Sequence, residues 1–153
     1  MTSKPVFSQT VQSQLLAKAT LRKEPKGAIL FRRGEPSLGV FLVRTGSIRL
    51  RLESKEGEAI LDRTVTRDAI VGLPATLCGG RYSLTALTLE ETELAFVDRK
   101  ALLELVVSDP DISFAMMHVL GEEIGQMREV LASVPSEAIP EAELSSSNVA
   151  RLT

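Results

Sequence analysis

The sequence predicts a mainly β fold with flanking helices: an antiparallel β jelly roll between a short N-terminal helix and a long C-terminal helix. Two observations support this prediction. About eight short β-prone segments lie between residues 21 and 97, with turn signals at the spacing expected of a sandwich or barrel. After Asp98 the apolar residues change to helical spacing and keep it to about residue 134.

Composition limits the chain to a few classes of protein. With 153 residues, 44% of them hydrophobic and 25% charged, it suits one globular domain with its own core. The formal net charge of −2 gives no overall basic surface for nucleic acid. No apolar run is long enough to span a bilayer, and MTSKPVFSQT holds no apolar signal-peptide core. We therefore expect no membrane segment and a cytoplasmic location.

The chain contains one cysteine and one histidine. Cys78 alone cannot form an internal disulfide or ligate an iron–sulfur cluster. It is either a redox-sensitive thiol or a small residue packed under its loop, and we favour the second. His118 alone argues against a His-rich metal site and against a Ser-His-Asp triad. We therefore predict no metal site and no catalytic residues.

The first elements are a short helix and a series of strands. Val11, Leu15 and Ala19 recur at helical spacing and predict an amphipathic helix within residues 7–20. In the segment 47–52 isoleucine or leucine alternates with arginine, as in a strand with one buried face. Turn residues separate the strands, which we expect at 21–24, 28–31, 39–44, 47–52, 59–65 and 70–71.

The stretch between residues 71 and 87 is the loop around which the chain is organised. Ala75 to Cys78 can make about one helical turn, opened by Gly72 and Pro74 and ended by Gly79-Gly80. A helical turn that faces Arg81 and the hydroxyls after it can hold an anion, because its free N–H groups and its dipole favour negative charge. The alternative is a plain surface crossover between strands.

Two more strands, 84–89 and 92–97, lead into the helical part of the chain. Asp98 is a good N-cap for a helix over 99–107, and Pro110 separates it from a second helix over 111–134. Beyond this helix, residues 135–153 contain two prolines, three consecutive serines and little apolar periodicity. We therefore expect one domain over 1–134 and a flexible tail over 135–153.

The long helix carries an apolar seam with alternating spacings of three and four, as in a coiled coil. A helix of about 24 residues spans roughly 36 Å, which is longer than a small barrel needs. The seam could simply cover the barrel, but we favour a helix that packs partly on its own barrel and partly on its twin in a homodimer. The seam residues are Met117, Leu120, Ile124, Met127, Leu131 and Val134.

A series of short motifs in order resembles the cyclic nucleotide-binding domain, in particular the sensor half of Crp/Fnr-type bacterial regulators related to the cAMP receptor protein. The resemblance covers about residues 21–131 and implies a jelly roll with flanking helices and a long dimerisation helix. The motifs are Lys26-Gly27, Leu30-Phe31, Gly34-Glu35, Val40-Phe41-Leu42-Val43, Gly46, Ile70-Val71-Gly72-Leu73, Tyr82-Ser83-Leu84-Thr85-Ala86 and Glu93-Leu94.

In that family the central loop is a phosphate-binding cassette. The resemblance places its ligand-binding positions at Gly72, Leu73, Pro74, Ala75, Arg81, Tyr82, Ser83 and Leu84. Leu73 stands where the family has a glutamate that accepts from the ribose, and Tyr82 stands where the family has an arginine that pairs with the phosphate. Leucine accepts no hydrogen bond, and tyrosine offers one neutral donor in place of a charged fork. Arg81 could substitute if the loop shifts.

These departures lead to a first hypothesis and three alternatives. The first is a non-enzymatic ligand-sensing or protein-interaction module with a degenerate cassette, dimeric through the long helix, for which cyclic AMP and cyclic GMP are not the natural ligands. The alternatives are the sensor half of a Crp/Fnr transcription factor, a true cyclic nucleotide binder that uses Arg81, and a cupin-like enzyme. The sequence shows no helix-turn-helix or basic recognition helix, and a cupin-like metal site would need more than His118.

Overall fold

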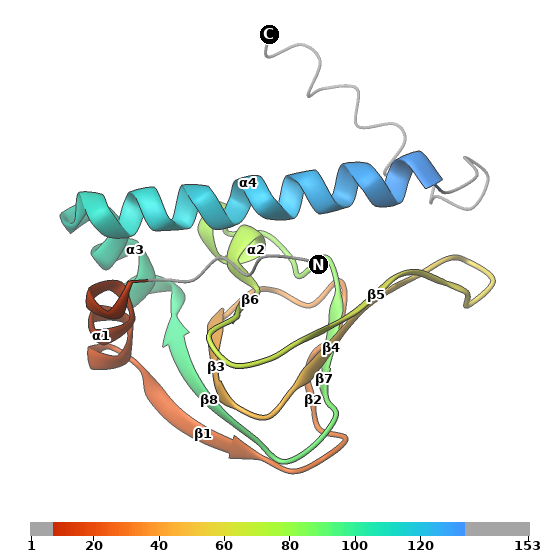
Figure 1. Ribbon diagram of the computed structural model, residues 1–153, viewed down its shortest axis with the longest axis horizontal. Coiled ribbons are helices and arrows are strands. Elements are labelled where there is room, and N and C mark those ends of the chain that lie inside the picture. The colour runs from red at the N-terminus through yellow and green to blue at the C-terminus, as the bar shows by residue number, and fades with distance from the viewer. Residues whose placement is uncertain (1–7, 134–153) are drawn as a thin grey trace, which may run out of the picture.

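The computed structural model describes residues 8–133 and shows a β-barrel with helices packed on one side (Figure 1). The elements in chain order are α1 (Gln9–Ala17), β1 (Thr20–Glu24), β2 (Ile29–Phe31), β3 (Gly39–Thr45), β4 (Ile48–Glu53), β5 (Ala59–Val65), β6 (Ile70–Val71), α2 (Leu73–Cys78), β7 (Thr85–Thr88), β8 (Thr92–Asp98), α3 (Arg99–Ser108) and α4 (Pro110–Ser133). The predicted tail and Val134 lie outside the described residues.

The strands form two four-stranded sheets, in the orders β1-β8-β3-β6 and β2-β7-β4-β5. Every pairing between the named strands is antiparallel. The two sheets face each other, as in a jelly roll, and this confirms the predicted fold class.

The central strand β3 is buried on both faces and separates two apolar cores. Since successive side chains of a strand point to opposite faces, Val40 and Leu42 pack toward the helices, while Phe41 and Val43 pack between the sheets. The helix-side core includes residues of α1, α3 and α4. Both cores reach the central loop, because the barrel core contains Val71 and Tyr82 and the helix-side core contains Leu73.

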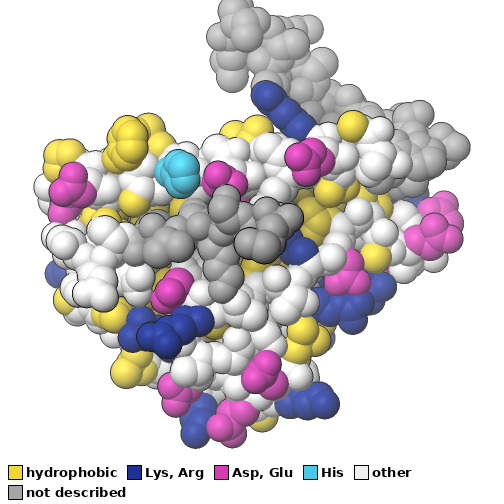
Figure 2. Space-filling model, viewed as in Figure 1, with side chains coloured by type: hydrophobic (Ala, Val, Ile, Leu, Met, Phe, Trp, Pro, Cys, Tyr) yellow, Lys and Arg dark blue, Asp and Glu magenta, His cyan; other side chains and the backbone are white. Residues whose placement is uncertain are grey.

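The long helix α4 lies along the helical side of the barrel, above α2 and α3 (Figure 1). It packs on the barrel through Ile112, Met116 and Val119, which are buried. Its predicted seam lies only partly against the barrel: Leu120 and Met127 are half-buried, whereas Met117, Ile124 and Leu131 are 60%, 55% and 44% exposed. Apolar side chains accordingly appear along the outer edge of α4 in Figure 2. None of the helices within residues 8–133 is long and apolar enough to cross a membrane.

Candidate functional site

The central loop begins with a left-handed turn. Gly72 has φ +88° and precedes the six-residue helix α2, which starts two residues earlier than the turn expected from the sequence. A Cβ atom at Gly72 would lie 2.9 Å from Cε1 of Tyr82. Glycine is therefore required here both for its backbone angle and for the close approach of the tyrosine ring.

Hydrogen bonds to the Ser37 side chain, the Gly39 backbone and the Arg99 side chain hold α2 in place. The Thr76 hydroxyl lies 2.7 Å from the Gly72 carbonyl oxygen, 3.0 Å from that of Gly39 and 2.6 Å from the Ser37 hydroxyl. Arg99, at the start of α3, donates from Nε to the Thr76 carbonyl oxygen at 2.9 Å. The loop is thus tied both to the barrel and to the helical layer.

Tyr82 fills the middle of the loop and is only 5% exposed. Its ring stacks on Phe31, with centroids 3.8 Å apart and planes inclined by 14°. Its hydroxyl donates to the Gly39 carbonyl oxygen at 2.7 Å and accepts from the backbone N–H of Leu38 at 3.3 Å. The phenol is therefore occupied by the protein itself and is not free to bind a ligand.

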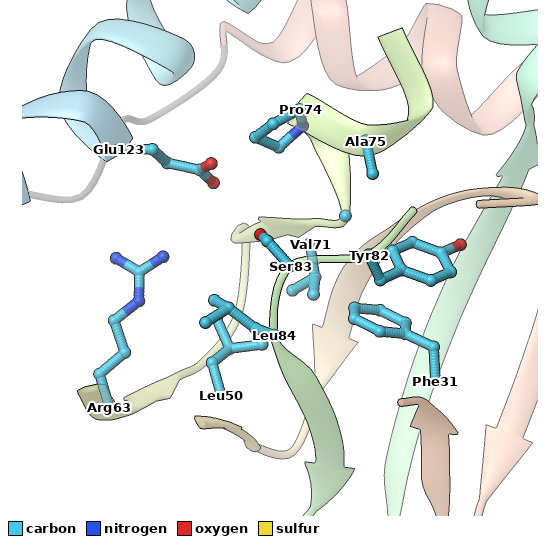
Figure 3. A pocket seen from close by; sticks show the side chains of 11 residues that line it. Phe31, Leu50, Arg63, Val71, Pro74, Ala75, Tyr82, Ser83, Leu84 and Glu123 are labelled. Atoms are coloured by element: carbon cyan, nitrogen blue, oxygen red, sulfur yellow. The ribbon is translucent and has the colours of Figure 1, made fainter. Parts of the chain in front are cut away.

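A cavity of about 30 Å³ lies beside this ring, between the loop, β4, β5 and α4 (Figure 3). Pockets for small molecules usually have volumes of ~300 Å³ or more, so this cavity holds about one or two water molecules. One end is apolar and the other polar. Its lining residues are Phe31, Leu50, Arg63, Val71, Gly72, Pro74, Ala75, Tyr82, Ser83, Leu84 and Glu123.

Two charged residues form the polar end of the cavity. Arg63 extends from β5 and Glu123 from α4, and their charged groups face each other across the mouth of the cavity (Figure 3). Burial raises the pKa of the Glu123 carboxyl and lowers the pKa of the Arg63 guanidinium, and each group partly offsets the effect on the other by its opposite charge. Both charges are therefore poorly compensated by the protein.

The family model of the cyclic nucleotide-binding domain matches residues 21–109, more than half of the chain. The chain belongs to the cyclic nucleotide-binding domain family. The matched range includes the loop from Gly72 to Ser83.

Relatives of this cyclic nucleotide-binding domain are CRP/FNR-type regulators rather than enzymes. The chain is 22% identical over 116 residues to the CRP-like cAMP-activated global transcriptional regulator of Mycobacterium tuberculosis, covering 76% of this chain and 52% of the regulator. It is 29% identical over 106 residues to the transcriptional activator protein FnrA of Stutzerimonas stutzeri, covering 69% of this chain and 43% of FnrA. The chain thus spans about half the length of the curated relatives it matches.

Solved structures share the fold of this cyclic nucleotide-binding domain. The catabolite activator protein of Thermus thermophilus superposes with a TM-score of 0.72 at 22% identity, covering 84% of this chain and 62% of that protein. A cyclic nucleotide-binding domain from Methylobacillus flagellatus superposes with a TM-score of 0.68 at 21% identity, covering 88% and 76%. At this level of identity the likeness concerns the fold alone.

Six of the eight predicted site residues line the cavity: Gly72, Pro74, Ala75, Tyr82, Ser83 and Leu84. Leu73 does not, so the expectation that it lines the pocket is wrong. The left-handed turn at Gly72 directs Leu73 into the helix-side core, where it is fully buried beside Leu42 and Val97. The residues that occupy the space beside the turn are Pro74 and Ala75.

Arg81 also lies away from the cavity. It is exposed, its backbone forms a bridge with Pro36, and its Nη1 donates to the carbonyl oxygen of Gly34 at 2.7 Å. The neighbouring Tyr82 points inward, as expected for adjacent residues of an extended segment. The arrangement therefore gives no support to a pocket in which Arg81 replaces the missing phosphate partner.

The single cysteine and histidine take no part in the cavity. Cys78 is exposed at the end of α2, so the expectation that it packs under the loop is wrong. It is the last residue of α2, next to the left-handed Gly79, where the helix turns outward. His118 is exposed on α4, with Nε2 at 3.8 Å from Oε1 of Glu122. Within residues 8–133 no group of three or more potential metal ligands occurs.

Sequence analysis missed Arg63 and Glu123, although each breaks an apolar pattern. Arg63 lies on the same face of β5 as Leu61 and Val65, which is the more buried face. Glu123 continues the spacing of Ile112, Met116 and Val119 on the barrel side of α4. A charged residue on a buried face is a signal for a special environment, because burying a charge costs free energy.

Proposed function

We propose that this chain is a non-enzymatic ligand-sensing module whose cassette has lost the charged contacts to a cyclic phosphate. In this proposal cyclic AMP and cyclic GMP are not its natural ligands, and occupancy of the pocket is reported through α4. The proposed module works as a homodimer. A cytoplasmic location stays a prediction.

The observation that carries the proposal is the environment of Tyr82. It stands at the position where the family resemblance expects the phosphate-pairing arginine, and its hydroxyl is already bonded to the Gly39 carbonyl oxygen. A charged bidentate donor is replaced by a ring stacked on Phe31. A cyclic phosphate placed here would lose its water without gaining a charged partner.

The sugar side of the cassette supports the same proposal. No carboxylate follows Gly72, and Leu73 is turned into the core. A buried ribose hydroxyl without an acceptor would cost about 1–3 kcal/mol. Together with the small cavity, this leaves neither end of a cyclic nucleotide well recognised.

A second candidate concerns the length of the protein. The chain spans 52% and 43% of the regulators it matches, which favours a sensor part of a longer CRP/FNR-type regulator. Under this proposal the same ligand-driven change in α4 would be passed to a DNA-binding part. A full-length gene sequence that continues beyond Thr153 into a helix-turn-helix segment would separate this candidate from a stand-alone module.

Calorimetric titration with cyclic AMP and cyclic GMP tests the proposed ligand preference. We expect no saturable heat at millimolar nucleotide for the wild-type protein. Micromolar binding would overturn the proposal. If such binding were lost in Arg81→Ala and kept in Arg33→Ala, the loop would have shifted to bring Arg81 into the pocket, and the cassette would be functional after all.

A further inference from the structure

Arg63 is a half-buried cation that has no direct counter-ion among residues 8–133. Its Nε is buried and has no hydrogen-bond partner, and it forms no ion pair with any residue between 8 and 133. Its guanidinium ends at the polar end of the cassette cavity (Figure 3). Arginine cannot escape this situation by losing its proton, because its pKa lies far above the physiological range.

Glu123 faces this cation from the other side of the cavity mouth. In Figure 3 its carboxylate lies between the Arg63 guanidinium and the Pro74–Ser83 side of the loop. The two groups interact through their charges without touching. The carboxylate of α4 thus lies beside the cassette, where an anionic group of a ligand would have to enter.

A groove between β5 and α4 lies next to the cavity and shares two lining residues with it. The groove has a volume of about 580 Å³, within the range of ~300–1,000 Å³ typical of ligand pockets. Arg63 and Glu123 line both spaces. Gln126, one turn further along α4, also lines the groove, and its Oε1 is buried without a hydrogen-bond partner within residues 8–133.

We propose that Arg63 is the anion-binding group of this site, that the ligand carries a carboxylate or phosphate group, and that Glu123 occupies the place of this group until the ligand displaces it. This inference rests on the proposed ligand-sensing function. It assigns the charged contact to β5 and α4, and not to the cassette loop.

An anionic ligand fits the two charges better than a cationic one. Glutamate can become neutral by taking up a proton, and its raised pKa favours that, whereas arginine stays charged and needs an anion. A ligand anion that pairs with Arg63 would also remove the attraction that holds Glu123 over the cavity. Binding would therefore loosen the contact between α4 and the barrel, which is a route from pocket to helix.

Rescue of a truncated side chain tests this inference. In Glu123→Ala the place of the carboxylate is empty, so we expect sodium acetate or sodium phosphate to raise Tm saturably, by about 3 °C near saturation, relative to sodium chloride at equal ionic strength. The double variant Arg63→Met/Glu123→Ala should lose this rise. Acetate and phosphate are separate arms and distinguish a carboxylate ligand from a phosphate ligand.

Glu122→Ala is the matched control, because it removes the neighbouring carboxylate that faces His118. The inference is wrong if Glu123→Ala responds to neither anion more than Glu122→Ala does, or if the double variant keeps the response. Glu123→Ser, which also leaves the place of the carboxylate empty, gives the same comparison should the alanine variant fold poorly. Failure here would leave the cyclic nucleotide titration unaffected, so the two proposals fail separately.

Discussion

The Tyr82 hydroxyl donates a hydrogen bond to the Gly39 carbonyl oxygen at 2.7 Å, across 43 positions of the chain. The same oxygen lies 3.0 Å from the Thr76 hydroxyl of α2. One carbonyl group at the start of β3 therefore fixes both the segment that leads from α2 to β7 and the helix α2 itself. The cassette is held in shape by its own side chains in place of a ligand.

Removing this hydroxyl should weaken the whole fold. We expect Tyr82→Phe to lower the free energy of unfolding by about 0.5–1.5 kcal/mol, because a buried hydrogen bond is lost while the stack on Phe31 remains. Urea denaturation followed by circular dichroism measures the change. Ser83→Ala at the exposed neighbouring position should shift the value by less than about 0.5 kcal/mol. An unchanged stability of Tyr82→Phe would show that the bond contributes nothing.

The left-handed turn at the start of α2 allows a paired glycine experiment. Gly57→Ala places a methyl group in open space at φ +84°, whereas Gly72→Ala places one 2.9 Å from the Tyr82 ring at φ +88°. The first should cost about 1–2 kcal/mol from backbone strain alone, and the second should cost more because the ring must also move. Denaturant titrations of both variants give the difference. Equal costs would show that Tyr82 does not press on this turn.

Much of the fold follows from local patterns in the sequence. Alternation in β4 predicted its one-sided burial, and the β-prone run at 39–44 predicted the strand β3, whose two-sided burial the structure adds. The direction of Leu73 could not be predicted, because it depends on how the left-handed Gly72 sets α2 against the rest of the fold. Exposure of Cys78 likewise depends on where α2 ends on the surface. Both features depend on tertiary packing, which local sequence patterns do not predict.

The polar end of the site has a signal in the sequence, because its two charged residues fall on apolar faces. Arg63 and Glu123 lie on faces that their own strand and helix bury. Periodicity places apolar residues on buried faces, whereas charged residues are usually exposed to solvent. Arg63 and Glu123 lie close together only because α4 packs against β5, and the sequence does not predict this packing.

The exposed part of the α4 seam predicts association. Met117, Ile124 and Leu131 are spaced seven residues apart and remain exposed, which is the arrangement of a helix that meets a second helix. We expect Ile124→Glu to convert a dimer to a monomer in multi-angle light scattering. Thr10→Glu on the exposed face of α1 introduces the same charge elsewhere and should leave the dimer intact. A wild-type protein that is monomeric at high concentration would rule out the predicted homodimer.

The last prediction concerns pH and follows from burial of Glu123. Its pKa is raised from the ordinary value of 4.5, chiefly by burial, while the positive charge of Arg63 on β5 opposes the shift. The folded state therefore binds this proton more tightly than the unfolded state. By linkage, this carboxyl makes the free energy of unfolding fall as pH rises from about 4.5 through the raised pKa.

Glu123→Gln cannot lose a proton at this position, so it should gain stability relative to the wild type between pH 4 and pH 7. Urea denaturation of both proteins at the two pH values measures this gain, and Glu122→Gln, which changes the neighbouring carboxylate 3.8 Å from His118, is the matched control. If Glu123→Gln instead lost stability relative to the wild type between pH 4 and pH 7, Arg63 would hold the pKa of Glu123 below 4.5. The pair would then be a closed ion pair, and the charge on Arg63 would not be available to a ligand.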